Sequence, residues 1–153
     1  MKVLMATPYF YPRVGGLELY AEAVARELVV AGWEVHVVTS AEVAGSEQYA
    51  GMTIHRLKAA FVVSNTPVNP LWRWQLRRLI AELKPDVINV HAPVPTMALA
   101  ATAAAGRTPV VVTYHAGSMK KGRRGVDQLI GVYEHVLHLG RLGYAKCLAR
   151  CSS

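Results

Sequence analysis

Short apolar runs alternate with amphipathic stretches from the start of the chain. Residues 2–6 (KVLMA) are a short apolar run that ends at Thr7 and Pro8, which is typical of a strand. An aromatic, glycine-rich loop follows, and then a helical pattern that Gly32 ends. The apolar positions of that pattern are Leu17, Tyr20, Ala21, Val24, Leu28 and Ala31. The pattern therefore predicts a strand, a loop and a helix in this order.

The same alternation continues along the rest of the chain. Further strands are predicted at 34–40, 52–57, 86–91, 109–115 and 145–151. Further helices are predicted at 71–83, 95–105 and 126–140, and the segments 41–51 and 58–70 are expected to be loops. Because several strands are apolar on both faces, we expect helices to cover both sides of the sheet. The predicted fold class is α/β, with a doubly wound parallel sheet.

The composition favours one folded domain. The 153 residues are 52% hydrophobic and 18% charged, which is enough apolar material for a packed core. The most apolar stretch, 97–106, is about half as long as the ~20 residues that cross a bilayer. The apolar run after Lys2 is also too short for a secretory signal. We therefore expect a cytoplasmic protein.

The formal net charge of +7 favours an anionic partner, for which nucleic acid, a phosphorylated ligand and an acidic bilayer all qualify. The basic residues gather in two patches. The first contains Arg73, Arg77, Arg78 and Lys84, and the second contains Lys120, Lys121, Arg123 and Arg124. The second patch follows the loop after His115, so we expect it to bind an acceptor or another anion over the same cleft.

The first patch lies on the predicted helix 71–83, which also carries two tryptophans. Trp72 belongs to an apolar stripe, whereas Trp74 lies beside the arginines. An aromatic and cationic face suits a membrane interface, and a solvated basic helix is the alternative. The membrane-facing set predicted here is Trp72, Arg73, Trp74, Arg77 and Arg78.

Ligands of parallel α/β sheets bind at the carboxyl ends of the strands, which directs attention to 7–16, 91–95 and 115–124. Gly15 and Gly16 come directly before the first helix, where free backbone N–H groups and the helix dipole attract anions. A tight turn into the helix is the alternative explanation for this glycine pair.

His115 ends an apolar strand beside small residues, so a ligand contact is one interpretation. A histidine that is hydrogen-bonded to backbone at a strand end is the other. His91 has a similar position, but Pro93 and Pro95 follow it and favour a structural role. His135 and His138 share a helix face without an apparent third ligand, so no metal site is predicted.

Several enzyme classes are disfavoured because the sequence lacks their motifs. The dinucleotide fingerprint and the Walker A pattern do not occur, and Ser40 stands where a ribose-binding acid would be. No cluster of carboxylates is evident, although glycosidases and metal-dependent phosphoryl transfer need one. The chain therefore resembles an incomplete catalyst.

Four segments in order carry a family resemblance: MKVLMATPYFYPRVGG, LVVAGWEVHVVTS, LKPDVINVHAP and TPVVVTYHAGS. Together they resemble the N-terminal half of family 4 retaining glycosyltransferases of GT-B fold, a group that includes phosphatidylinositol mannosyltransferases. The resemblance covers Met1 to Ser153. It implies one Rossmann-like domain on the acceptor side of a two-domain enzyme.

In that family the second domain grips the nucleotide sugar. The resemblance implies that Gly15 and Gly16 approach the donor phosphates and that His115 contacts the transferred sugar. It also implies a nucleotide sugar and an acceptor as partners. We expect no nucleic acid, no cofactor and no metal. Membrane-associated relatives suggest an anionic membrane surface as a further partner, at the inner face of the membrane.

The chain ends where the N-terminal domain of such an enzyme closes, so we expect a truncated form that transfers no sugar alone. The alternative is a freestanding α/β module that binds a phosphorylated ligand or an acidic surface.

Overall fold

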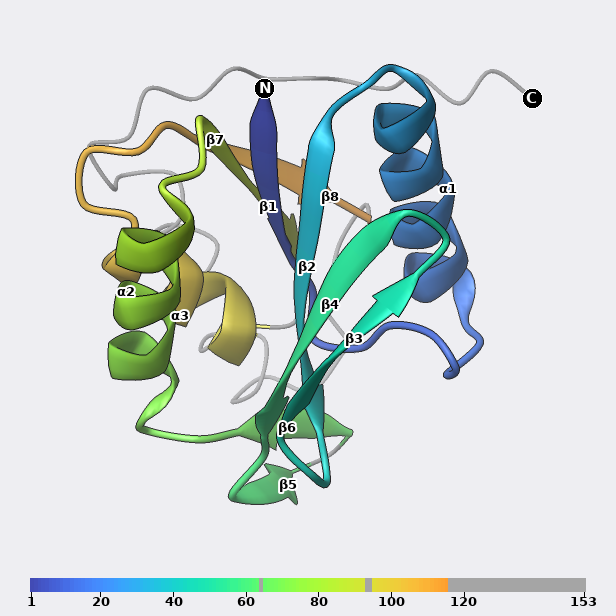
Figure 1. The fold of residues 1–153 in the computed structure, drawn as a ribbon. Helices are drawn as coiled ribbons and strands as arrows, with labels where there is room; N and C mark the ends of the chain where they lie inside the picture. The colour runs from blue at the N-terminus through green and yellow to red at the C-terminus, as the bar shows by residue number, and fades with distance from the viewer. Residues whose placement is uncertain (64, 93–94, 116–153) are drawn as a thin grey trace.

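A computed structural model describes residues 1–63, 65–92 and 95–115 of the protein. Six strands form a central sheet in the order β3-β4-β2-β1-β7-β8, and a two-stranded hairpin lies beyond one end of it (Figure 1). The sheet strands are β1 (Lys2–Ala6), β2 (Glu34–Ala41), β3 (Gly45–Tyr49), β4 (Met52–Lys58), β7 (Val87–Ala92) and β8 (Val110–Tyr114). The hairpin is β5 (Phe61–Val63) and β6 (Thr66–Val68), and the helices are α1 (Gly16–Val30), α2 (Trp72–Leu83) and α3 (Pro95–Ala104).

The strand order and directions confirm a doubly wound α/β fold. β1 pairs in parallel with β2 and β7, and β4 and β8 extend the parallel sheet on either side. Each predicted strand and helix within the described residues lies within one or two positions of an observed element. The predicted helix 126–140 and strand 145–151 lie outside the described residues.

β3 corrects the expectation of a loop over 41–51 and of an all-parallel sheet, because it pairs antiparallel with β4. Ala50 and Gly51 connect the two strands with φ of 48° and 82°, the conformation of a tight hairpin turn. The polar residues of β3 are exposed at the edge of the sheet, so the strand has no buried face. Hydrophobic alternation therefore gave no signal for it.

The β5–β6 hairpin likewise replaces part of the loop that was expected over 58–70. Each of its strands has only three residues, and Pro67 lies within β6. The side chains of Phe61, Val62 and Val63 are more than half exposed, so the hairpin presents an apolar strand to solvent. Short strands of this kind fall below the length that periodicity detects.

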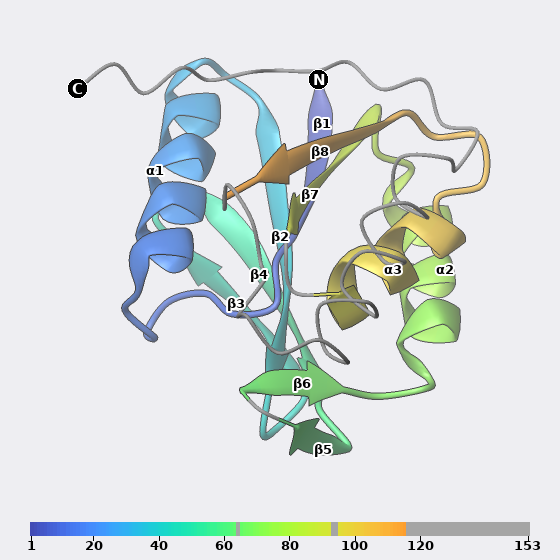
Figure 2. The ribbon, with the colours of Figure 1, turned by 180° about the vertical axis from the view of Figure 1, so that it is seen from behind.

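Helices cover the sheet on both faces, α1 on one side and α2 with α3 on the other (Figures 1 and 2). Because side chains alternate along a strand, Val3 and Met5 pack in the layer with α1, whereas Leu4 and Ala6 pack in the layer with α2 and α3. Among the described residues, no helix has the length and apolar character needed to cross a membrane.

Candidate functional site

The parallel strands end at one edge of the sheet, and the loop between β1 and α1 runs along it. The loop is held at its start, where the Thr7 backbone N–H donates to the Val38 carbonyl at 3.0 Å. Farther along, the Arg56 guanidinium donates to the Tyr11 carbonyl at 2.6 Å. The Tyr11 ring stacks on Tyr49 of β3 with 4.1 Å between the ring centroids. The unpredicted strand β3 therefore helps to fix the loop that leads into α1.

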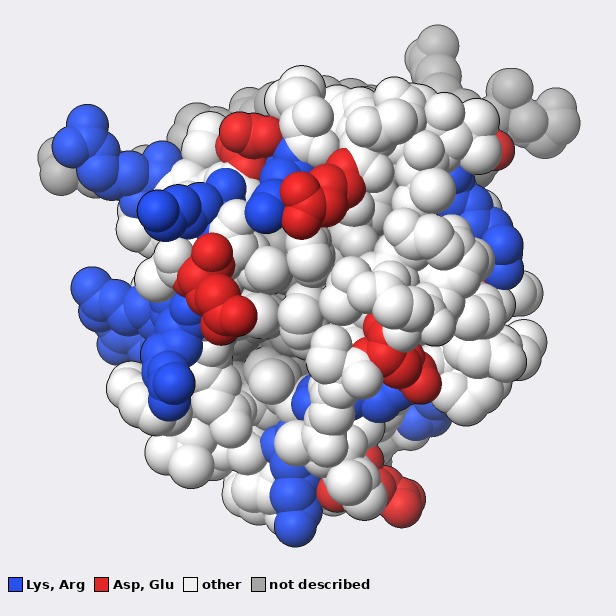
Figure 3. All heavy atoms as spheres, viewed as in Figure 1, with Lys and Arg blue, Asp and Glu red and all other residues white. Residues whose placement is uncertain are grey.

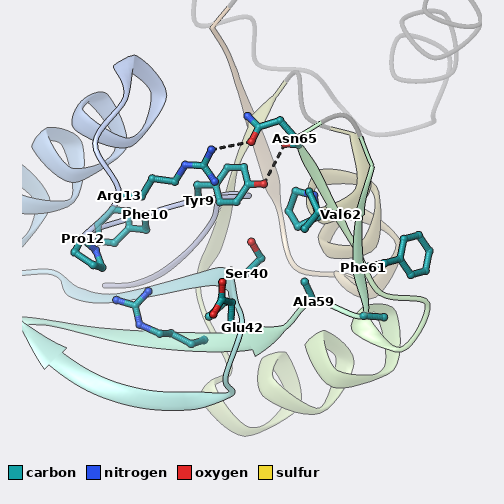
Figure 4. A pocket seen from close by; sticks show the side chains of 14 residues that line it. Tyr9, Phe10, Pro12, Arg13, Ser40, Glu42, Ala59, Phe61, Val62 and Asn65 are labelled. Carbon is teal, nitrogen blue, oxygen red and sulfur yellow. Dashed lines mark hydrogen bonds between the residues drawn. The ribbon is translucent and has the colours of Figure 1, made fainter.

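A cavity of about 670 Å³ lies between this loop and the β5–β6 hairpin (Figure 4). One wall is a cluster of three side chains. The Tyr9 hydroxyl donates to the Asn65 carbonyl at 3.1 Å, and the Arg13 guanidinium donates to Asn65 Oδ1 at 2.8 Å. The same guanidinium lies 3.7 Å from the centre of the Tyr9 ring. This cluster joins the hairpin to the loop across the cavity.

The cavity combines apolar walls with charged groups. Phe10, Ala59 and Val62 supply apolar surface, Arg13 and Arg56 place cations at the cavity, and Glu42 places a carboxylate there. The Arg56 guanidinium is ion-paired with Glu47 of β3. Such a lining suits a ligand that has both an apolar and a polar or anionic part. Sequence reasoning missed this cavity, because the hairpin that closes it was expected to be loop.

The glycine pair leads directly into α1, with Gly15 as the residue that precedes the helix. Gly15 has an extended backbone with φ of −167°, and neither Gly15 nor Gly16 adopts a positive φ. The turn therefore does not require glycine for backbone conformation. A Cβ atom on Gly16 would meet no described atom within 4 Å, so the first turn of α1 is open at this position.

Gly15 is covered differently. A Cβ atom built on it would clash with Glu18 Oε2, so the Glu18 carboxylate lies over Gly15 at the start of α1. Glu18 Oε1 is 3.8 Å from Arg13 Nε, which gives this carboxylate a cationic neighbour. An acidic group in the first turn is favourable because the N-terminal end of the helix dipole is positive.

His115 follows β8 and is paired with His91 of β7. His91 Nδ1 and His115 Nε2 are 2.9 Å apart, and the two rings stack with centroids 5.1 Å apart. Tyr20 of α1 lies against the pair, with 4.8 Å between its ring centroid and that of His115. The structure therefore joins two predicted regions of the strand edge, 91–95 and 115–124, through one contact.

The two imidazoles are held in their neutral forms. Burial lowers the pKa of His91 to about 3, and the neighbouring His115 adds to the effect. Burial also lowers the pKa of His115. A buried imidazole loses hydration that its charged form needs, so both rings are uncharged near neutral pH.

A second histidine pair lies on the other half of the sheet and was not predicted. His36 Nδ1 of β2 and His55 Nε2 of β4 are 3.0 Å apart. His36 Nε2 is also 2.9 Å from Glu34 Oε1, and that carboxylate is 3.0 Å from Lys2 Nζ. Within the described part of the chain, no group of three histidine, cysteine or acidic side chains could hold a metal ion.

The predicted membrane-facing set needs one correction. Trp72 is 1% exposed, and its indole N–H donates to the Lys58 carbonyl at 3.1 Å, so it belongs to the core. Trp74 is 59% exposed and lies beside the Arg78 guanidinium. Arg73 and Arg77 are exposed as well, and Figure 3 shows basic atoms gathered on the side where α2 lies. The apolar stripe that Trp72 shares with Leu76 was the signal of its burial.

The acceptor-binding or anion-binding residues predicted after His115 are not part of the described structure. They are Lys120, Lys121, Arg123 and Arg124.

Comparisons with known proteins give consistent results. The family described as Glycosyltransferase Family 4 matches residues 14–144. A curated relative is the UDP-N-acetylglucosamine--N-acetylmuramyl-(pentapeptide) pyrophosphoryl-undecaprenol N-acetylglucosamine transferase of Brucella anthropi. It is 27% identical over 124 residues, which cover 73% of this chain and 32% of the relative. The chain thus spans about a third of the length of this relative.

Among solved structures, sucrose-phosphate synthase from Thermosynechococcus elongatus is similar with a TM-score of 0.55 and 15% identity. The match covers 85% of this chain and 39% of the synthase. At this identity the likeness is one of fold, and it agrees with the mixed α/β architecture and its mostly parallel sheet.

Proposed function

The chain belongs to glycosyltransferase family 4, and from this premise we propose that it is the acceptor-side, N-terminal domain of a retaining enzyme that uses a nucleotide-sugar donor. A second domain holds the nucleotide in this proposal. The donor phosphates lie at the open turn of Gly16, the Glu18 carboxylate moves aside where they approach Gly15, and His115 contacts the sugar that is transferred.

One observation supports placing the donor between Gly16 and His115. Gly16 and Tyr20 are four residues apart in α1, so they share one face of the helix. His115 lies against Tyr20 with 4.8 Å between ring centroids. Phosphates at the open turn of Gly16 and a sugar at His115 would therefore bind in one continuous site. In this arrangement Gly16 and His115 both bind the donor, a role beyond forming a turn or ending a strand.

The cavity beside this edge is the proposed acceptor site. It is bounded by the β1–α1 loop that ends at Gly15, so an acceptor there would approach the donor from the same loop. Its apolar walls suit the hydrocarbon of an acceptor, and its two arginines, which outnumber the single Glu42 carboxylate of the lining, suit a phosphate. The Brucella relative is named for transfer to a pyrophosphoryl-undecaprenol, an acceptor of this chemical class.

A lipid-linked acceptor requires the protein to reach a membrane. We therefore propose that the exposed surface of α2, with Trp74, Arg73, Arg77 and Arg78, docks on anionic lipid. Indoles favour the membrane interface, and arginines near an anionic surface add electrostatic attraction. Trp72 takes no part in this surface, because it is buried.

Sugar transfer by the whole protein from a panel of nucleotide sugars tests the proposal. One donor should support transfer with retention of anomeric configuration, whereas the 153-residue chain alone should be inactive. Sustained transfer by this chain alone would contradict its assignment as an acceptor-side domain. Binding of a phosphorylated ligand without transfer by the whole protein would favour the alternative, a freestanding binding module.

Vesicle co-sedimentation tests the membrane surface separately. An Arg73, Arg77 and Arg78 triple Ala variant should bind anionic vesicles about a hundredfold more weakly, since each cation near the surface strengthens binding about fivefold. Arg107→Ala removes an exposed cation at another position and should leave binding almost unchanged. Equal binding of neutral and anionic vesicles, with no effect of the triple variant, would retire the membrane proposal alone.

A further inference from the structure

The hydrogen bond between His91 and His115 at the strand edge indicates which nitrogen of His115 holds its proton. We infer that His91 is a positioning residue, which holds His115 in the tautomer that presents its Nδ1–H to a ligand. The assignment of the tautomer rests on the geometry of the His91–His115 pair. The benefit to sugar transfer rests on the proposed function of His115.

The backbone fixes both residues before their side chains interact. β7 and β8 are parallel with Ala92 opposite Tyr114, and the His115 backbone N–H continues the ladder by donating to the Ala92 carbonyl at 3.1 Å. Two residues before each histidine, on the same face of the sheet, the Asn89 amide donates to the Thr113 hydroxyl at 3.0 Å. These bonds hold the two strands in one register, so the imidazoles meet in one arrangement.

The surroundings of His91 determine where its proton resides. The residue is 0% exposed, and its Nε2 atom is buried without a hydrogen-bond partner among the described residues. A neutral imidazole carries one proton. If it were on Nε2, a buried N–H would have no acceptor, whereas on Nδ1 it can be donated to His115 at 2.9 Å. The favoured form of His91 is therefore the Nδ1–H tautomer.

This assignment determines the state of the second ring. His115 Nε2 accepts the hydrogen bond, so the proton of neutral His115 must lie on Nδ1. If His91 Nδ1 and His115 Nε2 were both protonated, two N–H donors would point at each other. The stacking of the rings, with 17° between their planes, and the edge contact of Tyr20 restrain rotation of His115. The pair thus supplies a neutral donor in a fixed direction.

Nitrogen-15 NMR of the imidazoles in the protein tests the inference directly, because a bare and a protonated ring nitrogen have well-separated shifts. In the wild type, His115 should carry its proton on Nδ1 and leave Nε2 bare. In His91→Leu, the donor to Nε2 is lost, and a large share of His115 should change to the Nε2–H form. His91→Asn places an amide N–H near the original Nδ1, so it should restore the wild-type tautomer.

Sugar transfer by the same variants of the whole protein shows whether the tautomer matters to function. His91→Leu should lower kcat by roughly tenfold to a hundredfold, by analogy with partners that orient a metal-binding imidazole. His91→Asn should recover most of this loss. His55→Leu is the matched control, because it breaks the second pair of similar geometry. It should change neither the tautomer of His115 nor kcat.

The results separate the inference from the proposed function. A wild-type His115 with its proton on Nε2, or an unchanged tautomer in a folded His91→Leu variant, would overturn the inference whatever the activity. A changed tautomer with unchanged transfer would support the positioning of His115 by His91 and contradict the role of His115 in the proposed function.

Discussion

The described part of the chain contains two histidine pairs that are almost identical in geometry. His36 with His55 and His91 with His115 are joined by Nδ1 to Nε2 contacts of 3.0 and 2.9 Å. Their ring centroids are 5.3 and 5.1 Å apart, and both pairs are stacked. The contact itself therefore does not distinguish them.

The surroundings of the two pairs differ. The second nitrogen of His36 lies 2.9 Å from the exposed carboxylate of Glu34. The second nitrogen of His91 is buried without a partner among the described residues, and the His91 ring centroid lies 6.3 Å from that of Tyr20 of α1. Native proteins satisfy most buried N–H groups, so a bare nitrogen is the favoured state of His91 Nε2, whereas His36 Nε2 can donate to Glu34. The comparison suggests that the His36 pair is structural and the His91 pair belongs to the site.

Removal of one imidazole from each pair should separate their roles most clearly. In the whole protein, His115→Ala should lower kcat about a hundredfold, the size of effect expected when a hydrogen-bond donor to the reacting group is lost. His55→Ala should change kcat by less than about twofold, because no substrate lies near it in the proposed site. Steady-state kinetics of both variants measure the difference. Similar losses in both would erase the distinction between the pairs.

The next largest difference should be seen in acid. The pKa of folded His91 is lowered to about 3, well below the ordinary value of 6.5. The unfolded state therefore binds the proton more readily, and stability is fully present above pH 6.5 and is lost as the pH falls towards 3. Between pH 7 and 5 the loss from this residue is about 2 kcal/mol in the free energy of unfolding.

Urea unfolding at several pH values checks this prediction. His91→Asn should flatten the pH dependence. His55→Asn should flatten it less, because His55 is only partly buried, although burial also lowers its pKa. An equally steep loss of stability in the wild type and in His91→Asn would show that His91 is not the group responsible.

Valine substitutions at Gly16 and Gly51 compare a glycine of the proposed site with a glycine of a structural turn. Gly16→Val adds a side chain where no described atom lies within 4 Å, so the fold should persist while the KM for the donor rises about tenfold, since the backbone can no longer approach the phosphates. Gly51 lies in the β3–β4 turn with φ of 82°, and a Cβ atom there would meet Val29 Cγ1 at 2.8 Å.

Gly51→Val should therefore destabilise the protein without a change in KM. Donor kinetics and thermal unfolding of the two valine variants measure both effects. A wild-type KM in Gly16→Val would remove the phosphate role of this turn.

The smallest effect is expected at Glu34. Its carboxylate pairs with His36 and Lys2, and these two neighbours hold its pKa below the ordinary value. The group is exposed, and exposed ion pairs contribute little to stability. Glu34→Gln should shift the Tm by no more than about 2 °C and leave transfer unchanged. A loss of transfer in this variant would mean that the His36 pair is coupled to the site.

The sequence predicted the elements that build the strand edge and the place of His115 on it. It did not predict the partnership with His91, because the two residues are 24 positions apart and meet only through the register of β7 with β8. The prolines after His91 favoured a structural role, yet its side chain is the direct partner of His115.

Two other features were also beyond the sequence pattern. The edge strand β3 has no buried face, and the β5–β6 strands are too short to show a period, so the cavity they help to form had no signal. For Trp72 the sequence did contain a signal, because the apolar stripe it shares with Leu76 indicated burial. Its large aromatic ring beside arginines suggested a surface role that the core packing overrides.

The central claim is that the edge with His115, and not the His36 pair, contacts the sugar donor. It is tested most directly by following the imidazole NMR signals of the four paired histidines while the nucleotide-sugar substrate is added to the whole protein near neutral pH. The account predicts saturable shifts of the His115 signals, smaller shifts of His91, and unchanged signals of His36 and His55. Saturation of the donor site with no change at His115, or with shifts confined to His36 and His55, would contradict it.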